Sequence, residues 1–307
     1  MANACSPSKS FQDFEVVHAY PALIASKWSF VYADRRAVRC RHCILQWREG
    51  RSALAGTEQR TSPMRISRSA RTKIVLMTAA SVALYAGLLA FPQPLFQYSV
   101  RAENIVLHSD RPFCEGSAIK VLHLAERNIA RSPLYSNARK HNVFICNSRW
   151  RQMLFFNKDY GVAGVAQAEI TPNVFLRNAR IEDNRLISPR GTPVPGDRTL
   201  DYYVAHEIAH QLTADSIGGF RFHQLPQWVR EGYADYIGIG YSFNYDLEKR
   251  AFLAGKRDMD FAQSGLYKRF HLLVAHLIDH QHWTVERLLN DPPSQAAVET
   301  SIRQERP

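Results

Sequence analysis

An uncharged stretch of 18 residues, Ile74–Phe91, constrains this chain more than any other feature of its sequence. About 20 apolar residues in a helix are enough to cross a bilayer. The stretch also lacks the polar face that a helix on the surface of a globular domain carries. Pro92 and Pro94 follow it and stop the pattern. We therefore predict a membrane-spanning helix over residues 74–91.

The basic residues around this stretch are placed asymmetrically. Five precede it closely, and only Arg101 follows nearby; the five are Arg60, Arg65, Arg68, Arg71 and Lys73. Cytoplasmic flanks of membrane helices carry the excess of Lys and Arg. The sequence thus predicts a single-pass membrane protein with a cytoplasmic N-terminus and an exported (periplasmic or extracytoplasmic) C-terminal domain.

Two other interpretations of the apolar stretch stay open. We interpret the stretch as an uncleaved anchor. The first alternative is a signal peptide, whose cleavage would leave a secreted protein. The exit sequence Leu88–Gln93 lacks the small-x-small pattern of a cleavage site, which favours the anchor. A buried core helix is the third possibility, and the preceding basic cluster argues against it.

The net charge of +11 describes mainly the N-terminal segment. Residues 1–73 hold 13 Lys and Arg against 5 Asp and Glu, whereas the remaining residues hold 26 against 23. A nucleic-acid-binding domain would carry its basic residues on a folded face, so we expect no nucleic-acid partner. Residues 1–73 are predicted to be a poorly ordered cytoplasmic leader, and Met64 begins a plausible alternative start that would leave residues 1–63 untranslated.

The exported part, residues 97–307, has two cysteines, Cys114 and Cys146. Exported cysteines in an even number suggest a disulfide. We therefore predict that these two residues are paired.

Apolar periodicity in this part predicts both helices and short strands. Helices are expected over about 118–131, 200–214, 227–237 and 266–280, and strands over Asn142–Cys146 and Asn173–Arg177. Ser188–Asp197 is rich in Pro and Gly and is predicted to be a loop. The expected fold class is α+β, with a small mixed sheet packed against helices.

The predicted helix over 200–214 carries His206-Glu207-Ile208-Ala209-His210. Residues four apart lie on one side of a helix, so His206 and His210 can bind one metal ion. Glu207 lies about 100° around the helix, beside that ion, where a general base would act on a water molecule. The motif alone is short enough to arise by chance, so a third ligand is needed.

Glu231 and Asp235 are the best-placed acidic residues downstream, on the predicted helix over 227–237. The pattern in which a third histidine completes the site fails, because Thr213 and Ser216 stand where it requires Gly and His. Asp215 is too close behind His210 to be well placed as the third ligand. A solvated pair of carboxylates is the alternative interpretation of Glu231 and Asp235.

These segments resemble the gluzincin clan of zinc metallopeptidases, in particular its peptidase MA-like branch. In that clan the first motif is followed, about twenty residues later, by Glu-x-x-x-Asp on a second helix. Here 20 residues separate His210 from Glu231, Asp235 follows four residues later, and Leu225–Tyr236 is similar to the sequence pattern of the branch. The resemblance implies a zincin-like domain, one Zn²⁺ bound by His206, His210 and Glu231, and Asp235 as the carboxylate that orients a ligating histidine, with His206 favoured.

The resemblance also implies roles that its motifs do not locate sharply. Asn173–Arg177 is similar to the edge strand that holds an extended peptide, although it could equally be a core strand. A Tyr or His stabilises the oxyanion in this clan, and Tyr267, His223 and His271 are the candidates.

The expected function is that of a membrane-anchored zinc peptidase. Its substrate would be a peptide or protein, Glu207 would be the general base, and the membrane contact would be made through Ile74–Phe91. A non-catalytic exported domain that keeps the metal as a scaffold or regulator is the alternative. A structural membrane protein with a fortuitous motif is a third hypothesis.

Overall fold

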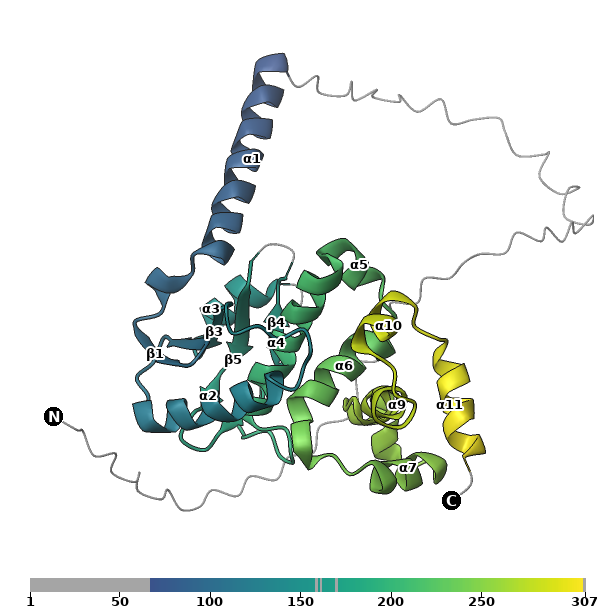
Figure 1. Cartoon of the computed structure of the whole chain (residues 1–307). Helices are drawn as coiled ribbons and strands as arrows, with labels where there is room; N and C mark the ends of the chain where they lie inside the picture. Colours follow the sequence, from purple (N-terminus) through teal and green to yellow (C-terminus); the bar gives the residue numbers. More distant parts are fainter. Residues whose placement is uncertain (1–66, 158–159, 161, 169–170, 306–307) are drawn as a thin grey trace, which may run out of the picture. The chain divides into compact units, whose positions relative to one another are not determined.

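The computed structural model describes residues 67–157, 160, 162–168 and 171–305 (Figure 1). The chain divides into two units, Met1–Thr72 and Lys73–Pro307. Of the first unit only residues 67–72 are described, and they begin helix α1. The predicted leader over residues 1–73, including the alternative start at Met64, therefore lies almost entirely outside the described residues.

Helix α1 (Arg68–Ala90) covers the predicted apolar helix except for its last residue, Phe91. Its residues Ser69–Ala90 are long and apolar enough to cross a membrane. The side chains of Ile74–Leu84 are exposed and take no part in the core of the described domain. The last turn differs, because Leu89 is buried against the domain. The helix is confirmed, whereas its crossing of a membrane stays a prediction.

A five-stranded mixed sheet forms the N-terminal half of the domain, in the order β1-β2-β3-β5-β4. The strands are β1 (Tyr98–Ala102), β2 (Ile105–Ser109), β3 (His141–Cys146), β4 (Gly164–Ala166) and β5 (Asn173–Arg177). Strands β2, β3 and β5 are parallel to one another, and the short outer strands β1 and β4 run antiparallel to their neighbours. The two predicted strands are thus the parallel centre of the sheet.

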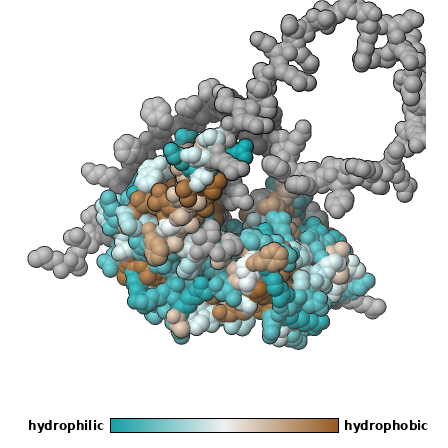
Figure 2. Space-filling view, turned by 90° about the horizontal axis from the view of Figure 1, so that it is seen from above, coloured by the Kyte–Doolittle hydropathy of each residue, from teal (hydrophilic) through white to brown (hydrophobic). Residues whose placement is uncertain are grey.

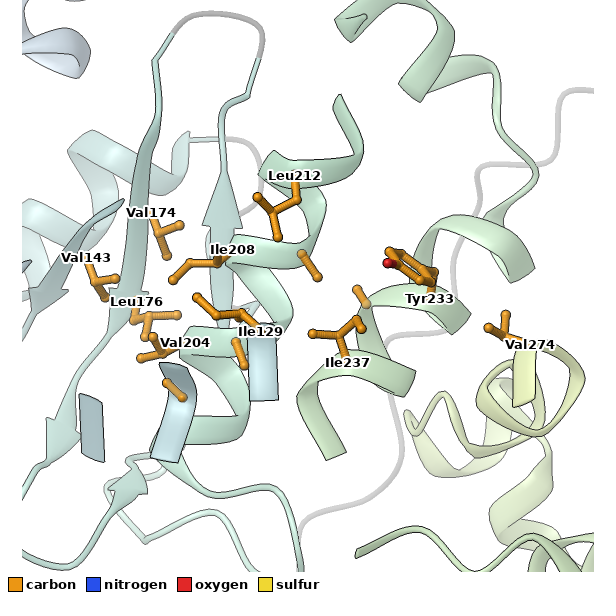
Figure 3. Packing of buried hydrophobic residues seen from close by; sticks show 14 of the residues in the cluster. Ile129, Val143, Val174, Leu176, Val204, Ile208, Leu212, Tyr233, Ile237 and Val274 are labelled. Atoms are coloured by element: carbon orange, nitrogen blue, oxygen red, sulfur yellow. The ribbon is translucent and has the colours of Figure 1, made fainter. Parts of the chain in front are cut away.

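Alternation along the central strands divides the core into two parts. Val143 and Ile145 of β3 face a large core that also includes helices α2 (Glu115–Ile129) and α4 (Leu200–Ile217). Phe144 and Cys146 face the other side. Figure 3 shows the large core, in which Val204 and Ile208 of α4 lie against Val174 and Leu176 of β5.

The smaller core is rich in phenylalanine and lies on the opposite face of the sheet. It is covered by α3 (Arg149–Phe156) and by the end of α1. Its buried residues are Leu89, Phe96, Phe144, Cys146, Phe155, Phe156 and Phe175.

The C-terminal half is helical. After the small hairpin of β6 (Ala179–Arg180) and β7 (Arg185–Leu186) come α4, α5 (Gly219–Gln224), α6 (Gln227–Ile239), α7 (Tyr245–Leu253), α8 (Phe261–Ser264), α9 (Lys268–Ala275), α10 (Val285–Asn290) and α11 (Gln295–Gln304). A π-helical turn, His276–His280, continues α9. The predicted helix over 266–280 therefore begins at Lys268 and changes from α-helix to π-helix after Ala275. The prediction of a mixed helix and sheet domain is confirmed.

The predicted disulfide between Cys114 and Cys146 is wrong. Cys146 is a free, buried thiol in the phenylalanine-rich core. Cys114 directly precedes α2, which packs on the other face of the sheet. Counting thiols could not reveal this, because one residue along a strand decides which face of the sheet a side chain reaches.

Of the two interpretations left open for Asn173–Arg177, the edge strand is wrong and the core strand is confirmed. This segment is β5, which pairs with β3 on one side and with β4 on the other. All five of its residues are buried. The edge strand is β4, which is only three residues long and gives a weak sequence signal.

Candidate metal centre

Helix α4 carries His206, Glu207 and His210 through the middle of the domain. All residues from Leu200 to Ala214 except Tyr203 are buried, so the helix is held on every side. His206 and His210 lie one turn apart and direct Nε2 toward the same point on α6. The predicted pairing of these histidines on one helix is confirmed as geometry.

Glu231 of α6 completes the cluster. Its Oε2 lies 3.6 Å from Nε2 of His206 and 3.5 Å from Nε2 of His210. A close approach of the two helices makes this possible. At Gly238 of α6 an added Cβ would lie 2.8 Å from the ring of Tyr202 on α4, so any larger residue would force the helices apart.

The three ligand atoms fit a shared ion better than they fit hydrogen bonds with one another. Good N–H···O hydrogen bonds measure 2.7–3.2 Å, shorter than the two distances to Glu231. Atoms bound about 2.0–2.2 Å from a tetrahedral ion lie about 3.3–3.6 Å apart. All three ligand atoms lie within 4.8 Å of one another, so the cluster could hold a metal ion.

Charge in the cluster is arranged to keep Glu231 ionised. Burial alone would raise the pKa of this carboxyl. The charge of His210 and the contacts from both imidazoles outweigh burial and hold the pKa of Glu231 well below its usual range. An ionised carboxylate beside two imidazole nitrogens is the donor set of His₂Glu zinc sites.

Asp235 lies behind the ligands and reaches His206 through an intermediary. The Tyr202 hydroxyl is 2.5 Å from Oδ1 of Asp235 and 3.3 Å from Nδ1 of His206. A proton on His206 Nδ1 can therefore be donated to Tyr202 Oη while Tyr202 donates to Asp235. With the proton on Nδ1, Nε2 would be the nitrogen that is free to bind a metal ion on the side that faces Glu231. The predicted partnership of Asp235 with His206 runs through a hydroxyl that the sequence analysis did not anticipate.

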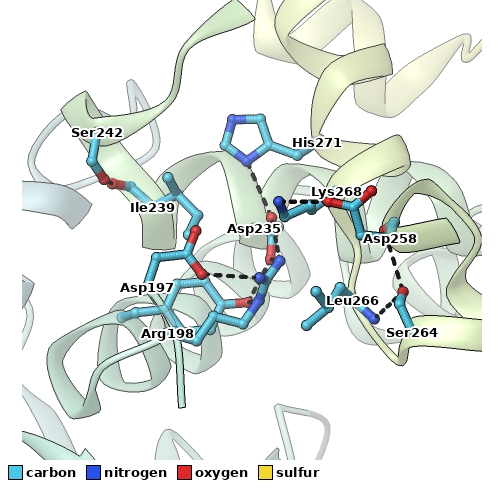
Figure 4. Close-up of polar contacts among 12 residues, drawn as sticks. Asp197, Arg198, Asp235, Ile239, Ser242, Asp258, Ser264, Leu266, Lys268 and His271 are labelled. Carbon is cyan, nitrogen blue, oxygen red and sulfur yellow. Dashed lines mark hydrogen bonds and ion pairs between the residues drawn. The ribbon is translucent and has the colours of Figure 1, made fainter. Parts of the chain in front are cut away.

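Two cationic or donor groups fix Asp235 from its other sides. Nη2 of Arg198 lies 3.0 and 3.2 Å from its two carboxylate oxygens, and Nδ1 of His271 lies 3.1 Å from Oδ2. Figure 4 shows Arg198 and His271 converging on this carboxylate. Although burial favours protonation, these contacts lower the pKa of Asp235. The carboxylate is therefore a fixed negative charge behind the ligands.

Glu207 faces the cleft beside the cluster. Burial raises the pKa of its carboxyl, and a backbone hydrogen bond from Ala166 of β4 opposes this rise. Gly164 of the same strand lies so close that an added Cβ would be 2.6 Å from Oε1 of Glu207. The carboxylate is thus held between α4 and the edge strand, where we expected a general base.

The three candidates for oxyanion stabilisation fall in different places. Tyr267 stacks on the His206 ring, with centroids 5.9 Å apart, and lines the cleft. Burial, together with the charges of Glu231 and Glu207, raises the pKa of its hydroxyl, which therefore stays a donor. His223 also lines the cleft. His271 does not, because it is buried against Asp235.

Asp215, the alternative third ligand, is directed away from the cluster. It forms an ion pair with Arg139 at the surface. The chain therefore places Glu231, and not Asp215, beside the two histidines.

The cleft over the cluster has a volume of about 360 Å³. Its walls are residues 162–166, which include β4, on one side and Phe222, His223 and Arg230 on the other. Because β4 is an edge strand, one side of its backbone is not paired within the sheet. The cleft thus offers a strand with one unpaired edge beside the candidate metal site.

Sequence reasoning missed Tyr202, Arg198 and Gly164. Tyr202 had a usable signal, since it precedes His206 by one helical turn and so shares its face. Arg198 lies in a loop and Gly164 in a three-residue strand. Neither segment is long enough to show a periodic pattern from which the contact could be predicted.

Comparison of the chain with models of known protein families and with curated proteins finds no match.

Proposed function

We propose that this protein is a membrane-anchored zinc peptidase with a zincin-like domain. The observation that carries the proposal is the convergence of His206, His210 and Glu231, from two helices, on one point. Beside that point lie a buried carboxylate, Glu207, and an edge strand. The resemblance to the gluzincin clan in these same residues supports the assignment.

One Zn²⁺ is the ion that this donor set favours, because two imidazole nitrogens and one carboxylate leave the fourth position of a catalytic site open. When bound, zinc lowers the pKa of water to about 7 and polarises a carbonyl. His206 is oriented for this role by Tyr202 and Asp235, and Glu231 contributes the negative charge.

Glu207 is the general base in this proposal. Its carboxylate accepts a proton from the attacking water as the water oxygen bonds to the carbonyl carbon of the scissile peptide. The same carboxyl then donates the proton to the amide nitrogen as the C–N bond breaks. Burial raises the pKa of Glu207, which makes its carboxylate a stronger base than an exposed one.

Two other features would position the substrate. The unpaired edge of β4 suits an extended peptide that adds a strand to the sheet. The Tyr267 hydroxyl suits donation to the oxygen of the reacting carbonyl, since it lies beside the cluster and retains its proton.

The membrane part of the proposal rests on α1 and on the flanking charges. Residues Ser69–Ala90 are sufficiently long and apolar, and Arg71 and Lys73 precede the apolar run. The positive-inside rule then keeps the N-terminus cytoplasmic and the domain after α1 exported.

Cleavage of a complex peptide mixture by the full chain in detergent, read by mass spectrometry, tests the activity. The zinc-loaded protein should generate new peptide termini, and Glu207→Gln should retain zinc but cleave about 100- to 10,000-fold more slowly. Both proteins showing the same absence of cleavage while binding zinc would support the alternative of a non-catalytic metal domain.

A further inference from the structure

The end of α1 is built into the folded domain. The Tyr85 hydroxyl donates to the carbonyl of Leu154 on α3 at 2.9 Å. Leu89 is 1% exposed within the phenylalanine-rich core. The amide of Asn173 on β5 donates to the carbonyl oxygens of Leu89 and Ala90, at 2.8 and 3.1 Å. The last two turns of α1 therefore contact α3 and β5 directly.

This attachment leaves little of α1 free to cross a bilayer. The exposed apolar run, Ile74–Leu84, covers only about 16 Å at 1.5 Å per residue. The hydrocarbon core of a bilayer is about 30 Å thick, and any tilt shortens the reach of a helix further. If α1 spans the membrane as proposed, the bilayer must extend past Leu84 to the depth of Tyr85–Ala90. Helix α3, which contacts that turn, then lies at the same depth.

The outer face of α3 has the residues that such a position requires. Trp150 and Met153 lie three residues apart, on one side of the helix, and are 50% and 59% exposed. Arg151 lies over the Trp150 ring, 4.2 Å from its centroid, and Arg149 is exposed beside it. Tryptophan together with Arg is typical of the boundary between headgroups and acyl chains.

We infer that the outer face of α3, formed by Trp150 and Met153, is a lipid-contact surface seated in the headgroup layer on the exported side. This inference rests on the proposed membrane crossing of α1. Phe91, which follows α1, is also 73% exposed.

The cleft adjoins this surface. Strand β4 follows α3 closely in the chain, and the amide of Gln167 donates to the carbonyl of Phe155 at 3.0 Å. Val165 of β4 packs against the same phenylalanine-rich core as α1 and α3. One wall of the cleft is therefore built on the same core as α1 and α3.

The opposite wall of the cleft also has an exposed apolar residue on the side of the domain that carries α1. Helix α5 lies on the side of the domain from which α1 rises (Figure 1), and its Phe220 is 79% exposed. Figure 2 looks onto this side and shows several hydrophobic patches, one of them over α1, among mainly hydrophilic surface.

Depth-dependent fluorescence quenching of the full chain in vesicles tests the inference. The vesicles contain phosphatidylcholine and phosphatidylglycerol, with part of the phosphatidylcholine brominated either near the carbonyl end or near the methyl end of its chains. Trp150→Phe is compared with Trp283→Phe, since Trp283 lies before α10 and is not part of the proposed surface. The difference from the wild type isolates the emission of each tryptophan.

The Trp150 emission should lose most of its intensity in vesicles brominated near the carbonyl end, and less in those brominated near the methyl end. The Trp283 emission should be unaffected by either lipid. Trp150 emission that is quenched by aqueous acrylamide but not by brominated lipid overturns the inference, as does emission shielded from both, which would indicate a protein partner on α3.

Alkaline carbonate extraction of the same vesicles separates this failure from a failure of the proposed function. If the chain resists extraction and Trp150 is not quenched by lipid, α1 spans the membrane and only the docking of α3 is refuted. If carbonate releases the chain, the membrane anchor itself is refuted and the inference falls with it.

Discussion

The hydroxyl of Tyr202 lies 3.3 Å from Nδ1 of His206, one helical turn further along α4. The same hydroxyl is 2.5 Å from Asp235 on α6. The tyrosine therefore links the Asp235 carboxylate to the His206 ring through its hydroxyl. The other nitrogen of that ring faces Glu231. Groups of this kind set the tautomer and the basicity of a ligating histidine.

Replacing this tyrosine by phenylalanine should weaken metal binding while keeping the ring that packs between the helices. We predict that Tyr202→Phe lowers zinc affinity by about 10- to 100-fold, as measured by competition with a fluorescent chelator. Tyr233→Phe is the matched control. Tyr233 is a buried tyrosine of α6 whose hydroxyl pairs with Ser132, 2.6 Å away. Equal loss of affinity in both variants would show a general effect of buried hydroxyls.

The contact between Gly164 and Glu207 predicts a loss of activity without a loss of metal. A Cβ at position 164 would lie 2.6 Å from Oε1 of Glu207, so the carboxylate must move. Gly164→Ala should reduce peptide cleavage by about 100-fold, because displacement of a catalytic group by about 1 Å has effects of that size. Zinc content should be unchanged.

Gly116→Ala in α2 is the control for this prediction, since an added Cβ there meets nothing within 4 Å. It should retain full activity. Full activity in Gly164→Ala would instead show that Glu207 is not held against β4 during the reaction.

His141 predicts how stability depends on pH. Burial, opposed by a side-chain contact with Gln211, lowers its pKa from 6.5 to about 4 in the folded protein. The unfolded chain therefore binds the proton more tightly, and stability is lost as pH falls from about 6.5 toward 4. The expected loss between pH 7 and pH 5 is about 2 kcal/mol from this group.

Urea unfolding in detergent, with chelator present to remove metal effects, measures this loss at both pH values. In His141→Gln the free energy of unfolding should decrease less between pH 7 and pH 5 than in the wild type. The difference should be about the same 2 kcal/mol. Parallel decreases in the two proteins would assign the acid sensitivity to other groups.

The charge asymmetry around α1 predicts the orientation of the chain. A phosphatase reporter that is active only after export, fused after Pro307, should be active, whereas the same fusion with residues 68–91 deleted should be inactive. A second reporter, active only in the cytoplasm, is fused at the same point. If that reporter is active and the phosphatase is not, the predicted topology is wrong.

The elements that the sequence predicted well are those with long periodic patterns. The motif helix, the helix with Glu231 and the central strand Asn173–Arg177 lie where apolar spacing indicated. The prediction that Glu231 lies beside His206 rested on a spacing known in the gluzincin clan. Periodicity within one helix could not supply it, because that pattern says nothing about the distance to another helix.

The failures share a different physical origin, the choice between two faces or two edges of a sheet. Cys146 points away from α2 because it follows the alternation of β3, and Asn173–Arg177 is central because the three-residue strand β4 covers its edge. Neither choice is visible in a local pattern. The role of Tyr202 was within reach of helical geometry, but only once a partner on α6 was known.

Zinc stoichiometry is the most direct test of the central claim, the assignment of three ligands to one ion. Metal analysis of the purified full chain, after equilibration with zinc and removal of excess, should give about one zinc per wild-type chain. Glu231→Gln should give far less, since a neutral amide replaces an anionic ligand, and Asp235→Asn should lie between the two. No stoichiometric zinc in the wild type, or zinc lost from Asp235→Asn but retained by Glu231→Gln, would contradict the assignment.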